Sequence, residues 1–299
     1  MSRLRLVLWL VLVALMASTA HAQTPTNGPY WLDISMGGPL IDWFNETASP
    51  TDIARIENIN QAATLLPLIR TGRKMVVFKS IPDAEARLPQ LADQVQIVGY
   101  NLETGPSYEA SEIASPVDSV KAMRALADEY GLLLALGPDH DLVVAYGPQL
   151  APYADIFVLQ IQRQQDNPPV VEAFVAESGS AIQAANPAIE LSVQIRAEDL
   201  EVADLIPQLQ PSPRGVSILT SPESVETTKA LVAALRALPA PTAPTALGGT
   251  GGGGPPPAEN EGAIPSTVIM LTAIGVLLAV SIAAGRLIYL ARQRRKPER

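Results

Sequence analysis

The sequence lacks cysteine and has two histidines, of which His140 is the one that lies beyond residue 22. Disulfides are therefore excluded as a source of stability, and a single histidine is too small a ligand set for a zinc site. A Gly-x-Ser-x-Gly elbow and a glycine-rich phosphate loop are also missing. These absences argue against a serine-hydrolase nucleophile and a dinucleotide site, and we expect no metal and no cofactor.

Basic residues are scarce in the central part of the chain. Residues 23–285 contain 13 Lys and Arg against 29 Asp and Glu, a net charge of about −16. Nucleic-acid binding needs a basic face, so we expect no nucleic-acid partner. Hydrophobic residues make up 47% of the chain, and a domain of about 200 residues can bury a core large enough to fold without disulfides.

The two ends of the chain carry targeting patterns. Arg3 and Arg5 precede an apolar run over 6–16 and a small-residue close, an order typical of a signal peptide over 1–22; an uncleaved anchor is the alternative. Residues 268–285 are 18 residues without a charge, and five basic residues follow in 292–299. We therefore predict a transmembrane helix over 266–291, with Val268–Ala284 in the lipid bilayer. The basic segment 292–299 is then a cytoplasmic tail, and the larger N-terminal part lies outside a cell membrane that the chain crosses once.

Composition divides the rest of the chain. Residues 23–29 form a short polar lead, and 30–238 have the mixed composition of one folded domain. From 239 to 265 Pro, Ala, Thr and Gly dominate, including the run Gly248–Pro257. Such a stretch cannot bury a core, so it is predicted to be a stalk between the domain and the membrane helix.

Short apolar runs alternate with amphipathic segments throughout 30–238. The predicted strands are Tyr30–Ser35, Lys74–Ser80, Gln96–Leu102, Leu132–Pro138, Ile156–Gln162, Glu190–Arg196 and Gly215–Ser221. The predicted helices are Thr51–Arg70, Ala84–Asp93, Pro116–Tyr130, Leu142–Ala151, Val170–Ala185, Leu200–Gln208 and Pro222–Leu238. Such repeats form parallel sheets with right-handed crossovers. An open doubly wound sheet and a closed barrel both fit; the domain length and the missing phosphate loop favour an α/β fold, a TIM-like (β/α) barrel of seven to eight strands.

Polar side chains occupy alternate positions near the ends of these strands. Side chains alternate between the two faces of a strand, and the face that packs on helices in a barrel must be apolar. The polar row should therefore point inward, toward the carboxyl-terminal mouth where barrel enzymes bind substrates. The residues of this row that we predict to bind a ligand are Asp33, Lys79, Asn101, Gln160, Gln162, Gln194 and Arg196.

Two segments of the chain suggest a family. The stretch Val98–Glu103, with Glu112 and Pro116 after it, and the stretch Ala151–Arg163 resemble uncharacterised secreted bacterial proteins with a glycoside-hydrolase-like TIM barrel. The resemblance covers most of 30–238. It implies a carbohydrate-active domain, a saccharide ligand, and an acidic residue at a strand end that serves as acid, base or nucleophile.

Carried onto this chain, the acidic role falls on Glu103, with Asp139 on the next predicted strand as its nearest partner. Each residue also has a structural interpretation, because Glu103 can cap a turn and Asp139 can cap the helix that follows it. The inward glutamines can likewise bond to one another instead of to a ligand. The alternative function is therefore that of a non-catalytic surface receptor or envelope scaffold built on a degenerate barrel.

Overall fold

The computed structural model describes residues 30–238 of the 299-residue chain. The predicted signal peptide 1–22, polar lead 23–29, stalk 239–265, transmembrane helix 266–291 and tail 292–299 lie outside these residues. No helix in the range that the structure describes has the length and apolar composition needed to cross a bilayer.

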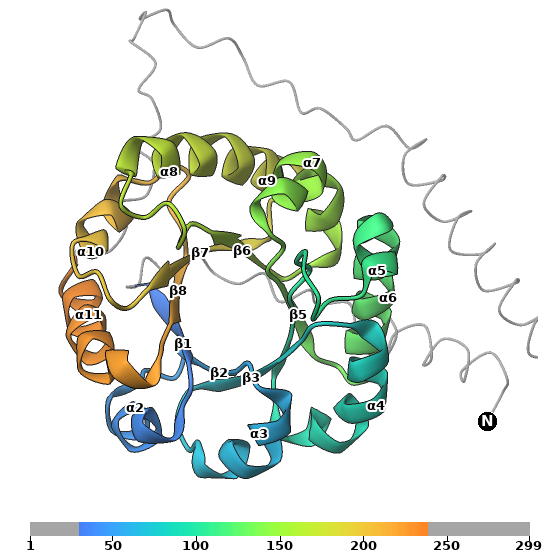
Figure 1. The fold of residues 1–299 in the computed structure, drawn as a ribbon, viewed down its shortest axis with the longest axis horizontal. Helices are drawn as coiled ribbons and strands as arrows, with labels where there is room; N and C mark the ends of the chain where they lie inside the picture. Colours follow the sequence, from blue (N-terminus) through green and yellow to red (C-terminus); the bar gives the residue numbers. More distant parts are fainter. Residues whose placement is uncertain (1–29, 239–299) are drawn as a thin grey trace, which may run out of the picture. The chain divides into compact units, whose positions relative to one another are not determined.

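Eight parallel strands form a closed barrel in which each strand pairs with its neighbours in sequence and β8 pairs with β1 (Figure 1). The strands are β1 (Trp31–Ser35), β2 (Ile53–Ile56), β3 (Arg73–Phe78), β4 (Ile97–Tyr100), β5 (Leu133–Leu136), β6 (Ile156–Gln160), β7 (Glu190–Arg196) and β8 (Gly215–Leu219). This is the arrangement of a TIM barrel, so the predicted closed barrel is confirmed and the open sheet is excluded.

Helices surround the ring of strands on the outside (Figure 1). They are α2 (Ile41–Thr47), α3 (Ile59–Leu65), α4 (Ile81–Leu91), α5 (Ala110–Ala114), α6 (Pro116–Glu129), α7 (His140–Leu150), α8 (Pro168–Phe174), α9 (Ser180–Ala185), α10 (Val202–Leu205) and α11 (Val225–Ala237). A π-helical turn over Val175–Gly179 joins α8 to α9. In α6 the buried residues Val120, Met123 and Ala127 recur every three or four positions, which is the spacing of one helix face.

The predicted helix over Thr51–Arg70 is wrong at its start, because β2 occupies Ile53–Ile56 and α3 begins only at Ile59. All four residues of β2 are buried. The side chain of Asn58 accepts a hydrogen bond from the Asn60 backbone N–H at 3.2 Å and caps the start of α3. The segment 51–70 therefore contains a strand and a short helix, although the spacing of its apolar residues fits one long helix.

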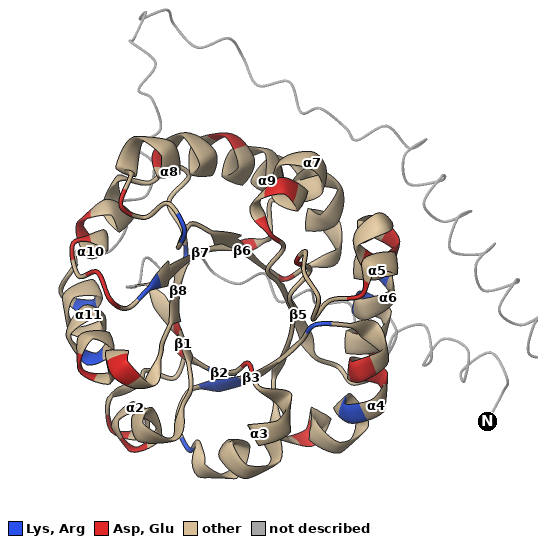
Figure 2. Ribbon diagram, viewed as in Figure 1, with Lys and Arg blue, Asp and Glu red and all other residues tan. Residues whose placement is uncertain are grey.

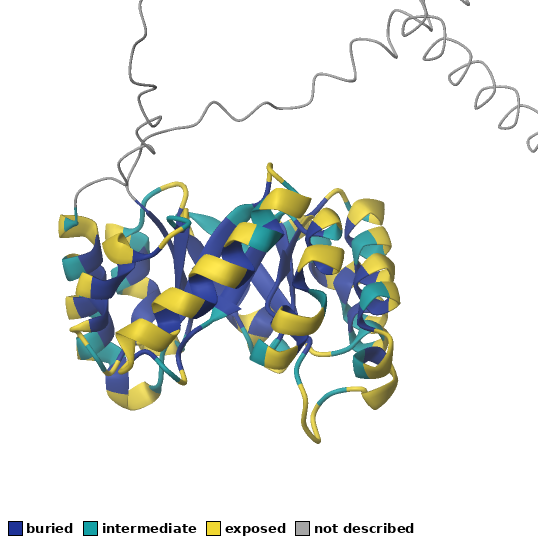
Figure 3. Ribbon diagram, turned by 90° about the horizontal axis from the view of Figure 1, so that it is seen from above, coloured by how far each residue is buried: buried dark blue, intermediate teal, exposed yellow. Residues whose placement is uncertain are grey.

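The two faces of the strands belong to two separate hydrophobic clusters. One cluster lies between the sheet and the helices, and the other fills the barrel interior. The interior cluster consists of Trp31, Ile53, Met75, Val77, Ile97, Ala135, Ile156 and Val158. Figure 3 shows buried residues along the strands and exposed residues on the outer faces of the helices. Polar residues that continue the interior rows toward the strand ends therefore also face the interior.

The amino-terminal ends of the strands form the closed end of the barrel. There the Trp31 ring lies against Gly215, where an added Cβ would approach a ring atom to 2.3 Å. Asp52, which precedes β2, accepts hydrogen bonds from the Leu32 backbone N–H at 2.9 Å and from the Arg236 guanidinium of α11 at 2.8 Å. These contacts join the last helix to the first two strands at the end opposite the mouth.

Candidate functional site at the barrel mouth

The polar strand ends meet at a cavity of about 190 Å³ at the mouth of the barrel, which we call the inner cavity. Its lining residues come from the ends of β2, β3, β4, β6, β7 and β8 and from the segments that follow them. They are Glu57, Val77, Lys79, Asn101, Glu103, Tyr108, Gln160, Gln162, Arg163, Gln194 and Leu219. The fold thus brings together six of the residues expected at the mouth, namely Lys79, Asn101, Glu103, Gln160, Gln162 and Gln194.

Glu103 is held from two sides. Its Oε1 accepts a hydrogen bond from Gln160 Nε2 at 2.9 Å, and its Oε2 accepts one from the Tyr108 hydroxyl at 2.8 Å. Burial and then the charge of Glu103 raise the pKa of Tyr108, so this hydroxyl stays protonated and acts as a donor. The Lys79 ammonium lies 5.3 Å from the centre of the Tyr108 ring, close enough for a cation–π contact. The carboxylate is therefore fixed in place within the cavity wall.

Two glutamines extend this arrangement across the mouth. Gln162 Nε2 donates to Gln160 Oε1 at 3.0 Å, and Gln160 Nε2 donates to Gly137 O at 3.0 Å as well as to Glu103. We call the chain from Gln162 through Gln160 to Glu103 the amide relay. Two of the three inward glutamines thus bond to each other, which is the alternative that the sequence left open, and the chain ends on the carboxylate.

A buried charged group lies within the barrel beside the inner cavity. The Arg55 guanidinium donates to Gln194 Oε1 and to Ile218 O, each at 3.0 Å. It also lies 3.3 Å from an Asp33 carboxylate oxygen and 3.2 Å from a Glu57 oxygen. Arg55 and Asp33 are 3% and 1% exposed. Arg55 thus holds two residues of the cavity wall, Gln194 and Glu57, from inside the barrel.

Asp33 lies within the barrel and lines neither cavity described here. The Ser217 hydroxyl donates to its Oδ2 at 2.8 Å. Burial raises the pKa of its carboxyl, while the charge of Arg55 and the bond from Ser217 lower it. Asp33 therefore forms an internal ion pair with Arg55, and its predicted contact with a ligand stays a prediction.

Asp139 also lies outside the lining of both cavities. Its Oδ1 accepts a hydrogen bond from the Leu142 backbone N–H at 3.3 Å and caps α7. Its Oδ2 accepts from the backbone N–H and the hydroxyl of Thr104 at 3.1 and 3.0 Å. Asp139 and Glu103 do not line a common cavity, and Asp139 has the helix-capping position that the sequence left open as its structural alternative.

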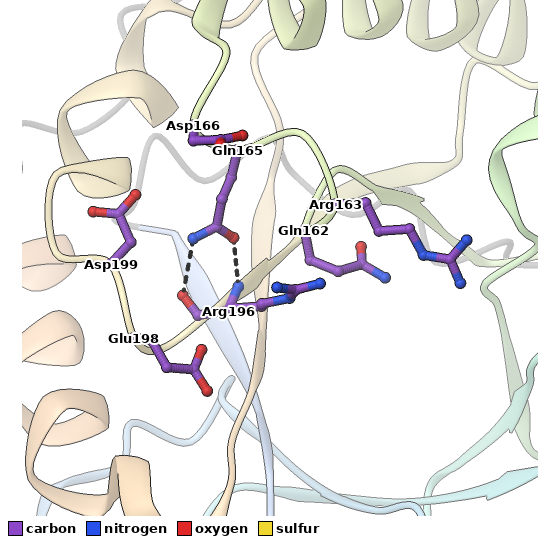
Figure 4. A pocket seen from close by; sticks show the side chains of 7 residues that line it. All are labelled: Gln162, Arg163, Gln165, Asp166, Arg196, Glu198 and Asp199. Carbon is purple, nitrogen blue, oxygen red and sulfur yellow. Dashed lines mark hydrogen bonds between the residues drawn. The ribbon is translucent and has the colours of Figure 1, made fainter.

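A second and larger cavity of about 610 Å³, the outer cavity, adjoins the inner one through the shared residues Gln162 and Arg163. Its full lining is Gln162, Arg163, Gln165, Asp166, Arg196, Glu198 and Asp199 (Figure 4). Gln165 Oε1 accepts from the Arg196 backbone N–H at 2.7 Å, and its Nε2 donates to the Arg196 carbonyl at 3.5 Å. Arg196, predicted at the mouth, therefore belongs to the outer cavity.

The charges of the inner cavity are balanced. Its lining contains two carboxylates, Glu57 and Glu103, and two cations, Lys79 and Arg163. Figure 2 shows acidic and basic positions both along the ring of strands and on the helices around it. Within 30–238 no group of three or more His, Asp or Glu side chains is placed to hold a metal ion.

Arg55, Glu57 and Arg163 also take part in this site, although they were not singled out from the sequence. Arg55 and Glu57 belong to the missed strand β2 and the residue after it, and Arg163 comes directly after Gln162. A signal for β2 exists in the spacing. Residues 36–73 separate the first two predicted strands, which is room for an additional strand between two helices. His140 lies outside both linings, and its ring stacks on Phe174 at 4.4 Å between ring centres.

No known protein family and no curated protein sequence matches the chain. Among solved structures, the chain is similar to 3-keto-L-gulonate-6-phosphate decarboxylase of Vibrio cholerae (12% identity, 70% of this chain, 98% of that one, TM-score 0.45). It is also similar to N-(5'-phosphoribosyl)anthranilate isomerase of Pyrococcus furiosus (11%, 68%, 98%, TM-score 0.40). A third similar structure is the endo-beta-N-acetylglucosaminidase of Cordyceps militaris (10%, 70%, 91%, TM-score 0.45). Similarity at this level does not indicate a function, which depends on the site of the chain itself.

Proposed function

We propose that the barrel mouth binds a saccharide. The observation that carries this proposal is the lining of the inner cavity, which combines carboxylates, amides, a phenol and cations in balanced charge. A sugar hydroxyl both donates and accepts hydrogen bonds, so it needs acceptors such as Glu103 beside donors such as Lys79. A charge-balanced wall of this kind selects neither a phosphate nor a bare cation.

A phosphorylated ligand fits less well than a neutral sugar. Barrel enzymes commonly bind phosphate at the loops after strands 7 and 8. In this chain Glu198 and Asp199 follow β7 and line the outer cavity. Two carboxylates beside Arg196 oppose an anion at this position.

A second candidate function, hydrolysis of a glycosidic bond, is favoured by one observation: Glu57 and Glu103 line the same cavity. Glycoside hydrolysis uses two carboxyl groups, about 5 Å apart for retention and about 6.5–9.5 Å apart for inversion. In such a reaction one carboxyl protonates the leaving oxygen and the other acts as base or nucleophile. Glu57 takes the place of Asp139 in this pair, because Asp139 caps α7 and lines neither cavity.

The binding proposal is tested by glycan-array screening of the full-length protein, kept in a detergent that contains no sugar. We expect selective binding to a group of related glycans that Lys79→Ala weakens at least about fivefold, as for a lost charged hydrogen bond. Lys229→Ala is the matched control, because Lys229 pairs with Glu226 on α11. No selective glycan binding, or equal loss in both variants, would count against the proposal.

Hydrolysis is tested with the glycans that bind. If the mouth is catalytic, Glu57→Gln and Glu103→Gln each abolish release of reducing sugar and lose much less of the binding. Glu109→Gln is the matched control, since Glu109 is exposed on the segment after Glu103. Binding without turnover in the wild type leaves the domain as a receptor and removes the catalytic candidate.

We further propose that the domain is exported and held to the membrane by 266–291. The charge pattern of the two chain ends supports this proposal. Fractionation of cells that express the full chain should place it in the membrane, and deletion of 266–299 should release it. The domain should be accessible to protease added from outside; protection from that protease would refute the proposed orientation.

A further inference from the structure

The inner cavity is smaller than most small-molecule sites. Small-molecule sites usually measure about 300–1,000 Å³, whereas the inner cavity measures about 190 Å³. The outer cavity of about 610 Å³ shares Gln162 and Arg163 with it. A ligand that contacts Glu103 and extends past these two residues therefore enters the outer cavity.

The amide relay fixes which atom Gln162 presents at this junction. Glu103 as a carboxylate and the Gly137 carbonyl can only accept, so Gln160 must turn its NH₂ group toward both of them. Its Oε1 then faces Gln162, which must donate its own NH₂ group. The remaining atom, Gln162 Oε1, is thereby set as an acceptor.

This acceptor is buried without a partner. Gln162 is 8% exposed, and its Oε1 has no hydrogen-bond partner among the residues that the structure describes. A buried carbonyl oxygen left without a donor is unfavourable, so the site is completed by a group that brings an O–H or N–H. The oxygen itself is covered by neighbouring atoms. Gln162 lines both cavities, so a ligand that passes from one into the other reaches this oxygen once the side chains that cover it move.

We infer that the ligand is an oligosaccharide that spans both cavities and donates a hydrogen bond to Gln162 Oε1. Gln162 is then a specificity-determining residue, and Glu103 sets its preference for a donor through the relay. The inference rests on the proposed saccharide function and adds the length and the donor requirement. Because three carboxylates, Asp166, Glu198 and Asp199, outnumber the two cations Arg163 and Arg196 in the lining of the outer cavity, the units that bind there are neutral or amino sugars and not uronic acids.

The test is calorimetric titration of the full-length protein, in a sugar-free detergent, with two probe series. The probes are β-1,4-linked oligomers of glucose and of N-acetylglucosamine, each from one to six units. We expect at least one series to bind about tenfold more tightly at four units than at one. The longer oligomer contacts the outer cavity as well as the inner one, whereas the single unit does not. Equal affinity for the monosaccharide and the tetrasaccharide would overturn the inference of a spanning ligand.

Gln162→Met keeps the side-chain length and removes the acceptor. We expect it to weaken tetrasaccharide binding roughly fivefold, the factor typical of one lost hydrogen bond. Gln164→Met is the matched control, since Gln164 lies in the same turn and lines neither cavity. Should Gln162→Met unfold, Gln162→Ala replaces it.

The outcomes separate the two proposals. Binding that neither Gln162 variant weakens overturns the role of Gln162 and leaves the saccharide function standing. Absence of binding by every probe and by every glycan of the array overturns the saccharide function, and the spanning ligand falls with it.

Discussion

Replacement of Arg55 by methionine is the most direct test of how the mouth is supported. The substitution keeps much of the side-chain volume and removes the guanidinium, which bonds to Gln194 and Ile218 and faces Asp33 and Glu57 at 3.0–3.3 Å. Asp33, 1% exposed, would then be a buried carboxylate without its cation. Removing one partner of a buried ion pair typically costs about 3–5 kcal/mol, so Arg55→Met should lower the melting temperature by roughly 10 °C.

The loss should depend on pH in a defined direction. Burial raises the pKa of Asp33 above its value of 3.8 in an unfolded chain, and Arg55 is the first influence that lowers it. A carboxyl with a raised pKa binds more protons when folded, so its contribution to stability is lost as pH rises through the folded pKa. Without Arg55 this pKa rises further. The variant should therefore be nearer to the wild type at pH 4 than at pH 8.

Urea unfolding at both pH values, each compared with the wild type at the same pH, measures this difference. Adding Asp33→Asn to Arg55→Met should recover about half of the loss at pH 8, because the buried charge is gone. Equal losses at pH 4 and pH 8, or no recovery in the double variant, would refute the view that Arg55 neutralises Asp33.

Three further predictions concern single positions. Asp139→Ala should lower the free energy of unfolding by about 1 kcal/mol, as for other lost helix caps, and an unchanged urea midpoint would contradict its capping role. Gly131→Ala should cost about 1 kcal/mol, because Gly131 ends α6 with a φ of +67°; calorimetry would show an unchanged melting temperature if this reasoning fails. Glu103→Gln should lower the pKa of Tyr108, since the charge of Glu103 helps to raise it. Ultraviolet titration of the phenol measures that shift, and no change would mean that the two side chains are not coupled.

Most of the barrel could be predicted because its strands follow the alternation rule closely. The seven predicted strands coincide with β1 and β3–β8, and the inward rows ending in Lys79, Asn101 and Gln160 reach one cavity. These polar rows can be recognised in the sequence because they alternate with apolar residues, which form the opposite face and pack on helices. The missed strand, β2, has four residues and carries Arg55 inside the barrel, so neither its length nor its polarity marks it as buried.

The candidate site was less predictable than the fold, because hydrogen-bond partners distant in sequence decide the role of each polar group. Asp33 and Asp139 occupy strand positions like those of the cavity residues. Asp33 accepts a hydrogen bond from Ser217 and pairs with Arg55. Asp139 accepts hydrogen bonds from Thr104 and from the start of α7. A single sequence shows that a carboxylate lies near a strand end, but it does not show which neighbouring groups donate hydrogen bonds to its oxygen atoms.

The bond from Arg236 to Asp52 has a practical consequence for handling the protein. It fixes the last helix beside the start of β2, so the described chain begins and finishes on the side away from the opening. A bead, sensor chip or affinity tag coupled through either end of this domain is therefore attached on the side opposite the barrel mouth. Immobilised molecules would keep their openings directed to the solution, and surface-based titrations could use them without blocking the site under study.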